Sequence, residues 1–109
     1  MAGTLIYQAP AGDPQTREIL TPGDTSTGIS STVYTNNGRQ ARYALIVNRT
    51  NTAMYCIDGT DPTASDTGKG FPMTAYTGIE LRGITAIKNF RCIDHASGVT
   101  SSLEVVCFF

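Results

Sequence analysis

The sequence predicts an all-β protein, a single small antiparallel β-sandwich or jelly-roll-like barrel with an irregular N-terminal arm. The chain has 109 residues, which is enough for one modest core and not for two. Only 16% of the residues are charged, and the chain is rich instead in Thr, Ser, Gly and Asn, which suit turns and lightly exposed strand faces. Short apolar runs are broken by turn signals roughly every 8–12 residues, and no window keeps helical periodicity without a Gly or Pro inside it.

Residues 1–40 differ from the rest because they carry few large apolar side chains. Residues 4–7 (TLIY) and 17–20 (REIL) are short strand candidates, and prolines cut both off, because proline removes a backbone donor and restricts the residue before it. A brief strand is expected at 33–35, before the turn signal at 36–38 (NNG). This third of the chain is expected to form either edge strands laid on the later core or an extended arm that a neighbouring subunit orders.

Residues 42–58 (RYALIVNRTNTAMYCID) are the part of the chain that the rest must pack around. The apolar run 44–47 is typical of a strand covered on both faces, and a second apolar run follows at 53–57. The polar residues 48–52 separate the two runs, and Asp58-Gly59 ends the second with a pair suited to positive φ angles. This pattern predicts an antiparallel β-hairpin.

The next part of the chain begins with a long polar loop at residues 58–70, rich in turn residues. One or two short strands are expected over 73–81, with Gly78 as a bend or bulge. A β-sandwich core over residues 41–109 is therefore expected, with the arm or edge strands confined to 1–40.

The last two strands are predicted at 84–93 and 99–109, and they are expected to pair as a second hairpin through the turn 94–98 (DHASG). In the last strand, alternation places Leu103, Val105 and Cys107 on one face and Glu104, Val106 and Phe108 on the other. A helix is not expected anywhere in the chain.

Charge and cysteine content exclude several classes of function. The net charge is −1 with the charges scattered singly, so neither a nucleic-acid partner nor a membrane surface is expected. No apolar run approaches the ~18–20 residues of a spanning helix, and the first residues lack the pattern of a secretory signal, so folding in a reducing cytoplasm is expected. The three cysteines, Cys56, Cys92 and Cys107, are expected to be buried free thiols, with a disulfide between two of them as the lesser alternative.

Three local patterns resemble chemical sites, but none has the arrangement that the chemistry requires. His95 beside Asp94 looks like an oriented base, but neighbours in a turn usually point apart. Residues 68–70 (GKG) lack the spacing of a phosphate-binding loop. The acidic loop residues Asp58, Asp61 and Asp66 could attract calcium, but the EF-hand spacing is absent. The sequence therefore predicts no catalytic residue, no cofactor and no metal ligand.

A family resemblance is carried by the order of segments in residues 42–109. An apolar strand (ALIVN) leads through a polar NxT turn to a second strand (AMYCIDGTDPT), a glycine-containing loop (TGKGF), the run GIELRGITAIKNFRCID and a last strand (SLEVVCFF). This order resembles the small β-sandwich virion proteins of tailed bacteriophages, which coat capsids or form accessory head and tail parts. The resemblance implies a non-enzymatic structural protein that is made in the host cytoplasm and carried on the virion.

The function that this resemblance implies is capsid decoration. Such a cement protein would stabilise the phage head through contacts with the major capsid protein or other virion subunits, and it would be a homotrimer. The two aromatic residues at 108 and 109 are expected to be pinned, either inside the fold or in a subunit interface. The candidate interface anchors are Leu5, Ile6, Tyr7, Ile19, Leu20, Phe108 and Phe109.

Two other functions are open at this point. The first is a carbohydrate- or receptor-binding β module of a phage fibre or tail. The second is a small β enzyme, although no paired acids and no nucleophile–base set can be named in the sequence.

Overall fold

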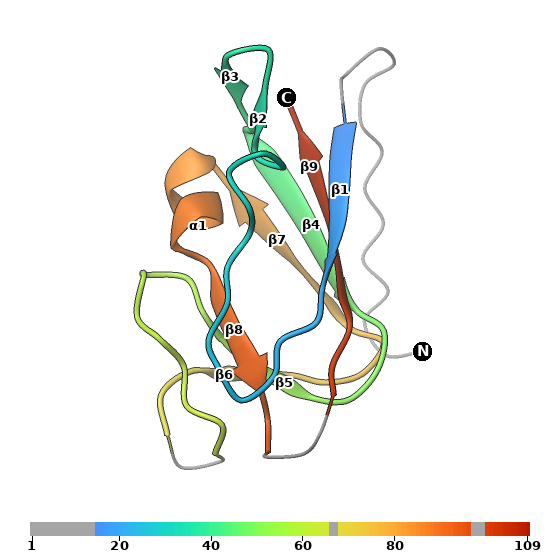
Figure 1. Cartoon of the computed structure of the whole chain (residues 1–109), viewed down its shortest axis with the longest axis vertical. Coiled ribbons are helices and arrows are strands. Elements are labelled where there is room, and N and C mark those ends of the chain that lie inside the picture. The colour runs from blue at the N-terminus through green and yellow to red at the C-terminus, as the bar shows by residue number, and fades with distance from the viewer. Residues whose placement is uncertain (1–14, 66–67, 97–99) are drawn as a thin grey trace.

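Nine strands and one short helix make up the described chain, residues 15–65, 68–96 and 100–109 of a computed structural model (Figure 1). In chain order the elements are β1 (Gln15–Leu20), β2 (Thr35–Asn36), β3 (Arg39–Gln40), β4 (Tyr43–Asn48), β5 (Ala53–Cys56), β6 (Phe71–Met73), β7 (Gly78–Arg82), α1 (Ile84–Asn89), β8 (Arg91–Asp94) and β9 (Leu103–Phe108). The predicted all-β class is therefore confirmed. The finer architecture, a sandwich or jelly-roll-like barrel, stays a prediction.

The described strands form three antiparallel sheets. A four-stranded sheet has the order β1-β9-β4-β7, and a three-stranded sheet has the order β6-β5-β8. The strands β2 and β3 pair only with each other. In Figure 1 the long strands β4 and β9 run down the centre of the molecule, and α1 lies to their left, above β8.

Side-chain alternation directs one face of the four-stranded sheet and one face of the three-stranded sheet into a common core. The core cluster takes members from both sheets and from the helical segment, and they include Ile46, Met73, Ile87, Phe90, Cys92, Leu103, Val105 and Cys107. The three inward residues of β9 are 0% exposed, which confirms the face predicted for them.

The predicted hairpin over residues 42–58 is wrong, because β4 and β5 belong to different sheets. The polar segment 49–52 carries the chain from one sheet to the other, and Asn48 fixes this crossing. Its buried side-chain amide donates to the carbonyl oxygens of Asn51 at 2.8 Å and Met73 at 2.7 Å. The two apolar runs were located correctly, but their partners depend on contacts that are distant in sequence.

The second predicted hairpin is also wrong. The strand β8 pairs with β5, whereas β9 pairs with β1 and β4. The segment predicted as the first half of the β8 strand is the helix α1, which contradicts the expectation that the chain has no helix. This helix has only six residues and buries only Ile87 fully, so it is too short to produce a helical pattern in the sequence.

The first described strand, β1, is an edge strand that pairs with β9 over all six of its residues. It contains the predicted strand at 17–20. Further along, Thr27 forms an isolated bridge with Cys92, with N–O distances of 2.9 and 2.8 Å, so the connection after β1 lies against β8. Within the described residues 15–40, β1 therefore lies at the edge of the four-stranded sheet and Thr27 lies beside β8, whereas β2 and β3 pair only with each other.

The turn predicted at 36–38 is confirmed, and it closes the β2–β3 hairpin. Asn37 has φ 52° and Gly38 has φ 77°, the left-handed pair that a tight hairpin turn requires. The strand predicted at 33–35 begins later, at Thr35, because Val33 is held in a preceding turn by a hydrogen bond from its N–H to the Ser30 carbonyl. The strand predicted at 4–7 lies outside the described residues.

Candidate functional site

The predicted interface anchors fall into three groups. Leu5, Ile6 and Tyr7 lie outside the described residues. Leu20, Phe108 and Phe109 are buried within the chain, at 6%, 7% and 2% exposure, so they have little surface to offer a neighbour. Ile19, on the edge strand β1, is 54% exposed and is the one described anchor with a large accessible side chain.

The aromatic end of the chain is pinned inside the fold, which was one of the two predicted alternatives. Phe109 lies in the core cluster, and its carbonyl oxygen accepts a hydrogen bond from the Arg42 guanidinium at 3.0 Å. Phe108 packs edge-on against Tyr43, with ring centroids 5.6 Å apart. These two aromatic residues are therefore better described as structural residues of the four-stranded sheet than as anchors for a partner.

A surface patch of a different composition lies where β5 and β6 meet, and we call Tyr55 and Phe71 the aromatic patch. Phe71 is 61% exposed. Tyr55 pairs across the strands with Phe71, with ring centroids 5.8 Å apart, and it stacks on the buried Phe90 at 6.1 Å. A row of three rings thus runs from the core to the surface, which gives the exposed Phe71 a rigid support.

Among the described strands, the aromatic patch lies at an open edge of the three-stranded sheet. The strand β6 is the outer strand of the three-stranded sheet, and its central residue is Pro72. Because proline has no backbone N–H, this edge is a poor template for adding another strand. A partner is therefore expected to contact the side chains of the patch and not to extend the sheet.

Sequence reasoning missed this patch, although one signal for it was present. Phe71 stands between Gly70 and Pro72, so a large apolar side chain is placed in a segment where proline favours a sheet edge. An isolated phenylalanine in a polar segment forms no apolar run, so the pattern of apolar runs does not indicate its position.

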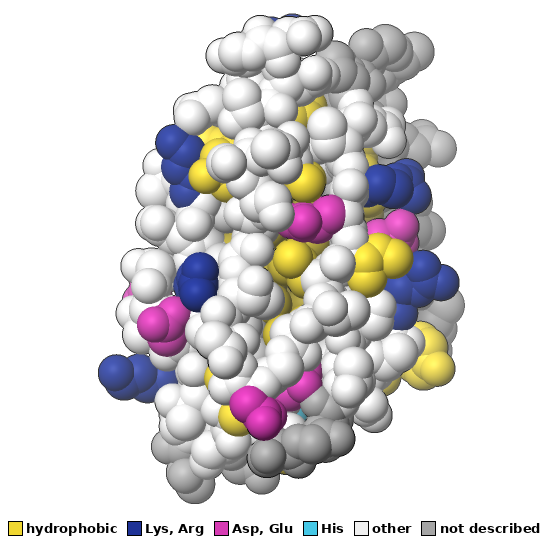
Figure 2. All heavy atoms as spheres, in the orientation of Figure 1, with side chains coloured by type: hydrophobic (Ala, Val, Ile, Leu, Met, Phe, Trp, Pro, Cys, Tyr) yellow, Lys and Arg dark blue, Asp and Glu magenta, His cyan; other side chains and the backbone are white. Residues whose placement is uncertain are grey.

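Charged groups are mixed across the visible surface. On the face in Figure 2, basic and acidic side chains are interspersed, with apolar side chains between them. Glu104 lies between Arg17 at 3.1 Å and Arg49 at 3.8 Å, and Arg82 lies 3.4 Å from Glu80. Exposed pairs of this kind contribute at most about 1 kcal/mol each. Because positive and negative side chains are mixed on this face, it has no continuous positive potential that would attract a polyanion.

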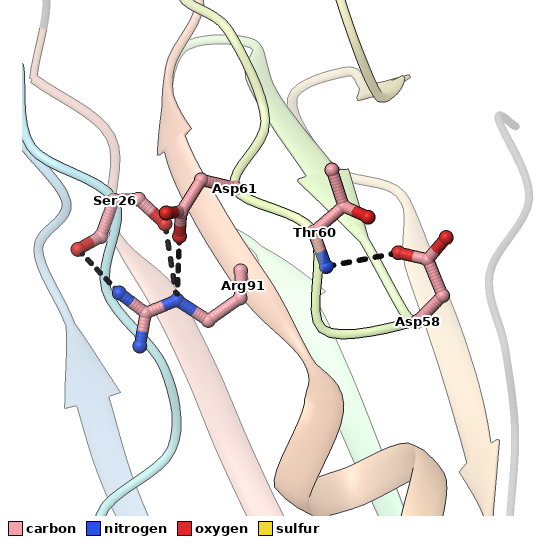
Figure 3. A network of polar contacts seen from close by, with 5 residues as sticks. All are labelled: Ser26, Asp58, Thr60, Asp61 and Arg91. Carbon is pink, nitrogen blue, oxygen red and sulfur yellow. Dashed lines mark hydrogen bonds and ion pairs between the residues drawn. The ribbon is translucent and has the colours of Figure 1, made fainter.

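The acidic loop is used for internal contacts (Figure 3). Asp61 accepts a hydrogen bond from the Arg91 Nε at 3.2 Å, and the same guanidinium bonds the hydroxyl and carbonyl oxygens of Ser26 at 3.1 and 2.8 Å. Asp58 accepts a bond from the Thr60 backbone N–H at 3.0 Å, which lowers the pKa of its carboxyl. The two carboxylates point to different partners, and no group of three metal-ligating side chains exists among the described residues.

The residues at the β8–β9 connection make structural contacts. Asp94 is 1% exposed and its carboxylate accepts the Ser101 N–H at 3.1 Å; burial raises the pKa of this carboxyl, and Ser101 partly opposes the rise. The Ser101 hydroxyl donates to the carbonyl oxygen of Thr52 at 3.3 Å, and the His95 backbone N–H donates to the same oxygen at 3.2 Å. The two hydrogen bonds to Thr52 tie the β8–β9 connection to the crossing between the two sheets, and the Asp94–Ser101 bond closes the connection on itself.

The three cysteines are buried free thiols, as predicted. Burial raises the pKa of Cys92 to about 12 and that of Cys107 to about 11, and it also raises the pKa of Cys56. A thiol attacks as its thiolate, so these side chains are not poised as nucleophiles at neutral pH.

The comparisons with known proteins add no relative. No protein-family model, no curated protein and no solved structure matches this chain. Within the described residues, no helix has the length and apolar character needed to cross a membrane. The functional interpretation therefore depends on the surface chemistry of this chain and on the resemblance seen in its sequence.

Proposed function

We propose that this protein is a non-enzymatic structural component of a virion, a capsid decoration (cement) protein that stabilises a phage head through protein–protein contacts. The observation that carries the proposal is the aromatic patch: an exposed phenylalanine, supported by a row of rings, on a sheet edge that cannot readily add a strand. Aromatic side chains are enriched in the buried centres of protein interfaces, where they supply most of the binding energy.

The small size of the patch favours a repetitive partner. Phe71, at 61% exposure, offers on the order of 100 Å² of side-chain surface, against ~800 Å² on each side of a standard interface. A single contact of this size would be weak. A capsid lattice offers the same contact many times, and linked contacts raise the overall affinity without any larger interface.

The proposal includes a homotrimer that contacts the major capsid protein or neighbouring virion subunits. Ile19 on the β1 edge is expected to be a second contact. Mixed surface charge suits such a role, because an apolar contact does not depend on long-range attraction. Light scattering on the full-length chain should give a mass of about 35 kDa for a trimer of the 11.6 kDa subunit.

The direct test is co-sedimentation with phage heads that were assembled without this protein, taken from the phage whose genome encodes it. Wild-type protein should sediment with the heads, and Phe71→Ala should weaken each contact about tenfold, the effect of losing ~1.4 kcal/mol of binding energy. The matched control is Tyr76→Asn, which changes another exposed aromatic residue and should sediment like the wild type.

Two results would contradict the proposal. If the wild-type protein failed to bind such heads, the decoration function would be wrong. If the chain proved to be encoded in a genome without capsid genes, the virion assignment would be wrong whatever the protein binds.

A further inference from the structure

The two outer strands of the four-stranded sheet, β1 and β7, leave open edges among the described residues. The edges of the three-stranded sheet are protected, because β6 carries Pro72 and because Thr27 bridges Cys92 on the far side of β8. Neither β1 nor β7 contains a proline. A strand with unpaired backbone groups is a template for another strand, so these two edges are where the sheet could be extended.

The hydrogen bonds at the two ends of β7 show which of its backbone groups face the open edge. The Asn48 N–H donates to the Thr77 carbonyl oxygen, and the Gly83 N–H donates to the Arg42 carbonyl oxygen, each at 2.8 Å. These two bonds flank the β4–β7 pairing, and bonded and non-bonded pairs alternate along an antiparallel ladder. The β7 residues whose N–H and C=O groups point away from β4 are therefore Gly78, Glu80 and Arg82.

The same reasoning gives the free groups of β1. The Arg49 N–H donates to the Ser102 carbonyl oxygen at 2.8 Å, just beyond the β4–β9 pairing, so alternate residues of β9 direct their backbone groups to β1. The β1 residues whose N–H and C=O groups point away from β9 are therefore Gln15, Arg17 and Ile19. The side chains of all three are exposed.

Opposite charges stand at the two ends of one row across the sheet. The strand registers place Arg17, Val106, Leu45 and Glu80 in this row, in that order. The Arg17 side chain is 64% exposed, and the Glu80 carboxylate accepts a hydrogen bond from the Tyr43 hydroxyl, which holds it on the same face. Figure 1 shows β1 and β7 on opposite sides of the central strands β4 and β9.

The β7 edge of one copy fits the β1 edge of another. Each step across the order β1-β9-β4-β7 reverses the strand direction, so β7 can add to β1 of the next copy as an antiparallel strand. With Glu80 opposite Arg17, the five residues of β7 face residues 15–19, and the free backbone groups of both edges meet. Opposite charges that face each other across two strands stabilise the pairing.

Pairing of like edges is less favourable. Opposite residues must lie on the same face of the sheet, so two β1 strands would set Arg17 against Arg17 or Glu18 against Glu18. Two β7 strands paired over their full length would set Glu80 against Glu80. A shifted pairing of two β7 strands sets Glu80 against Arg82, but it joins only residues 80–82. The contact between unlike edges is therefore the full-length pairing in which opposite charges meet.

We propose that copies of this protein associate head to tail, with the β7 edge of one copy added to the β1 edge of the next in a continuous antiparallel sheet. A head-to-tail contact closes into a ring when the rotation between copies allows it. The inference rests on the proposed function only for the number of copies, three. The aromatic patch belongs to the other sheet, so shell binding and this contact can be tested separately.

The test is charge reversal, with the mass of the full chain measured by analytical ultracentrifugation over a range of concentrations. Wild-type protein should reach about 35 kDa, three times the 11.6 kDa subunit. Arg17→Glu and Glu80→Arg each set like charges opposite and should weaken each contact about tenfold. The double variant Arg17→Glu/Glu80→Arg restores an opposite pair and should recover the wild-type mass.

The matched control is Arg49→Glu. Arg49 lies 3.8 Å from Glu104, the same carboxylate that Arg17 contacts, but it is not part of either open edge. This variant therefore reproduces the charge change near Glu104 and should keep the wild-type mass. Thermal unfolding of every variant checks that a lower mass does not come from loss of the fold.

Three outcomes would overturn the inference: a wild-type protein that stays monomeric at every concentration, an Arg17→Glu variant that associates like the wild type, or a double variant no better than the single ones. Rescue of Glu80→Arg by Arg82→Glu would identify the shifted contact between two β7 strands and would also overturn it. If the charge reversals behave as expected but the protein does not sediment with phage heads, the contact is correct and the decoration function is wrong.

Discussion

Asn48→Ala is expected to destabilise the protein strongly, because this side chain holds the crossing between the two large sheets. The Asn48 side chain is 0% exposed and makes three hydrogen bonds: it donates to the carbonyl oxygens of Asn51 and Met73 and accepts from the Thr50 N–H at 3.1 Å. Alanine removes all three and leaves the carbonyl oxygen of Met73 without this partner in the interior.

The magnitude follows from these contacts. A hydrogen bond contributes about 1 kcal/mol net, and a buried group left without a partner costs about 1–3 kcal/mol more. The variant should therefore lose about 3–4 kcal/mol of the free energy of unfolding, out of the ~5–15 kcal/mol typical of a domain. At roughly 4 °C per kcal/mol, the Tm should fall by about 12–16 °C.

The assay is urea unfolding followed by circular dichroism, with the free energy of unfolding extrapolated to water. The matched control is Asn51→Ala, which removes one exposed side-chain bond, the 2.8 Å contact with the Thr100 carbonyl oxygen, and should lose under about 1 kcal/mol. Equal losses in the two variants would refute the view that the buried amide fixes the crossing.

Three further predictions concern the buried groups. Burial raises the pKa of the Asp94 carboxyl above its ordinary 3.8. The protonated carboxyl therefore stabilises the folded state at pH values below 3.8, and this stabilisation is lost as the pH rises through the higher pKa of the folded state. Asp94→Asn should therefore be more stable than the wild type at neutral pH, with the difference shrinking in acid, and a pH-independent difference in urea titrations would contradict this. Cys92 and Cys107, with pKa values of about 12 and 11, should react with Ellman's reagent only after unfolding; rapid labelling of the native protein would show that they are accessible. Phe109→Ala should lower the free energy of unfolding by about 3–5 kcal/mol, because it leaves a cavity in the core, whereas Ile19→Ala at an exposed position should lower it by under about 1 kcal/mol. The reverse order in thermal unfolding would contradict the burial of Phe109.

The sequence by itself determined the β class and the place of most strands. Alternation located β9 and its inward face, the short apolar runs located β4 and β5, and the Asn37-Gly38 pair located the tight turn. Each of these features is local, because a strand period of two or a residue that tolerates positive φ is visible within a few positions of the chain. The buried state of the cysteines was also predicted from their apolar neighbours.

The tertiary structure alone decided which strands pair and which aromatic residues reach the surface. Neighbouring strands β4 and β5 were expected to pair, but the Asn48 side chain holds the segment that separates them into two sheets. Pairing and exposure depend on contacts between residues far apart in the chain, which periodicity does not record. The sequence left open whether Phe109 is buried in the fold or in an interface, and the structure places it in the core, while Phe71 and Tyr76 lie exposed on the surface.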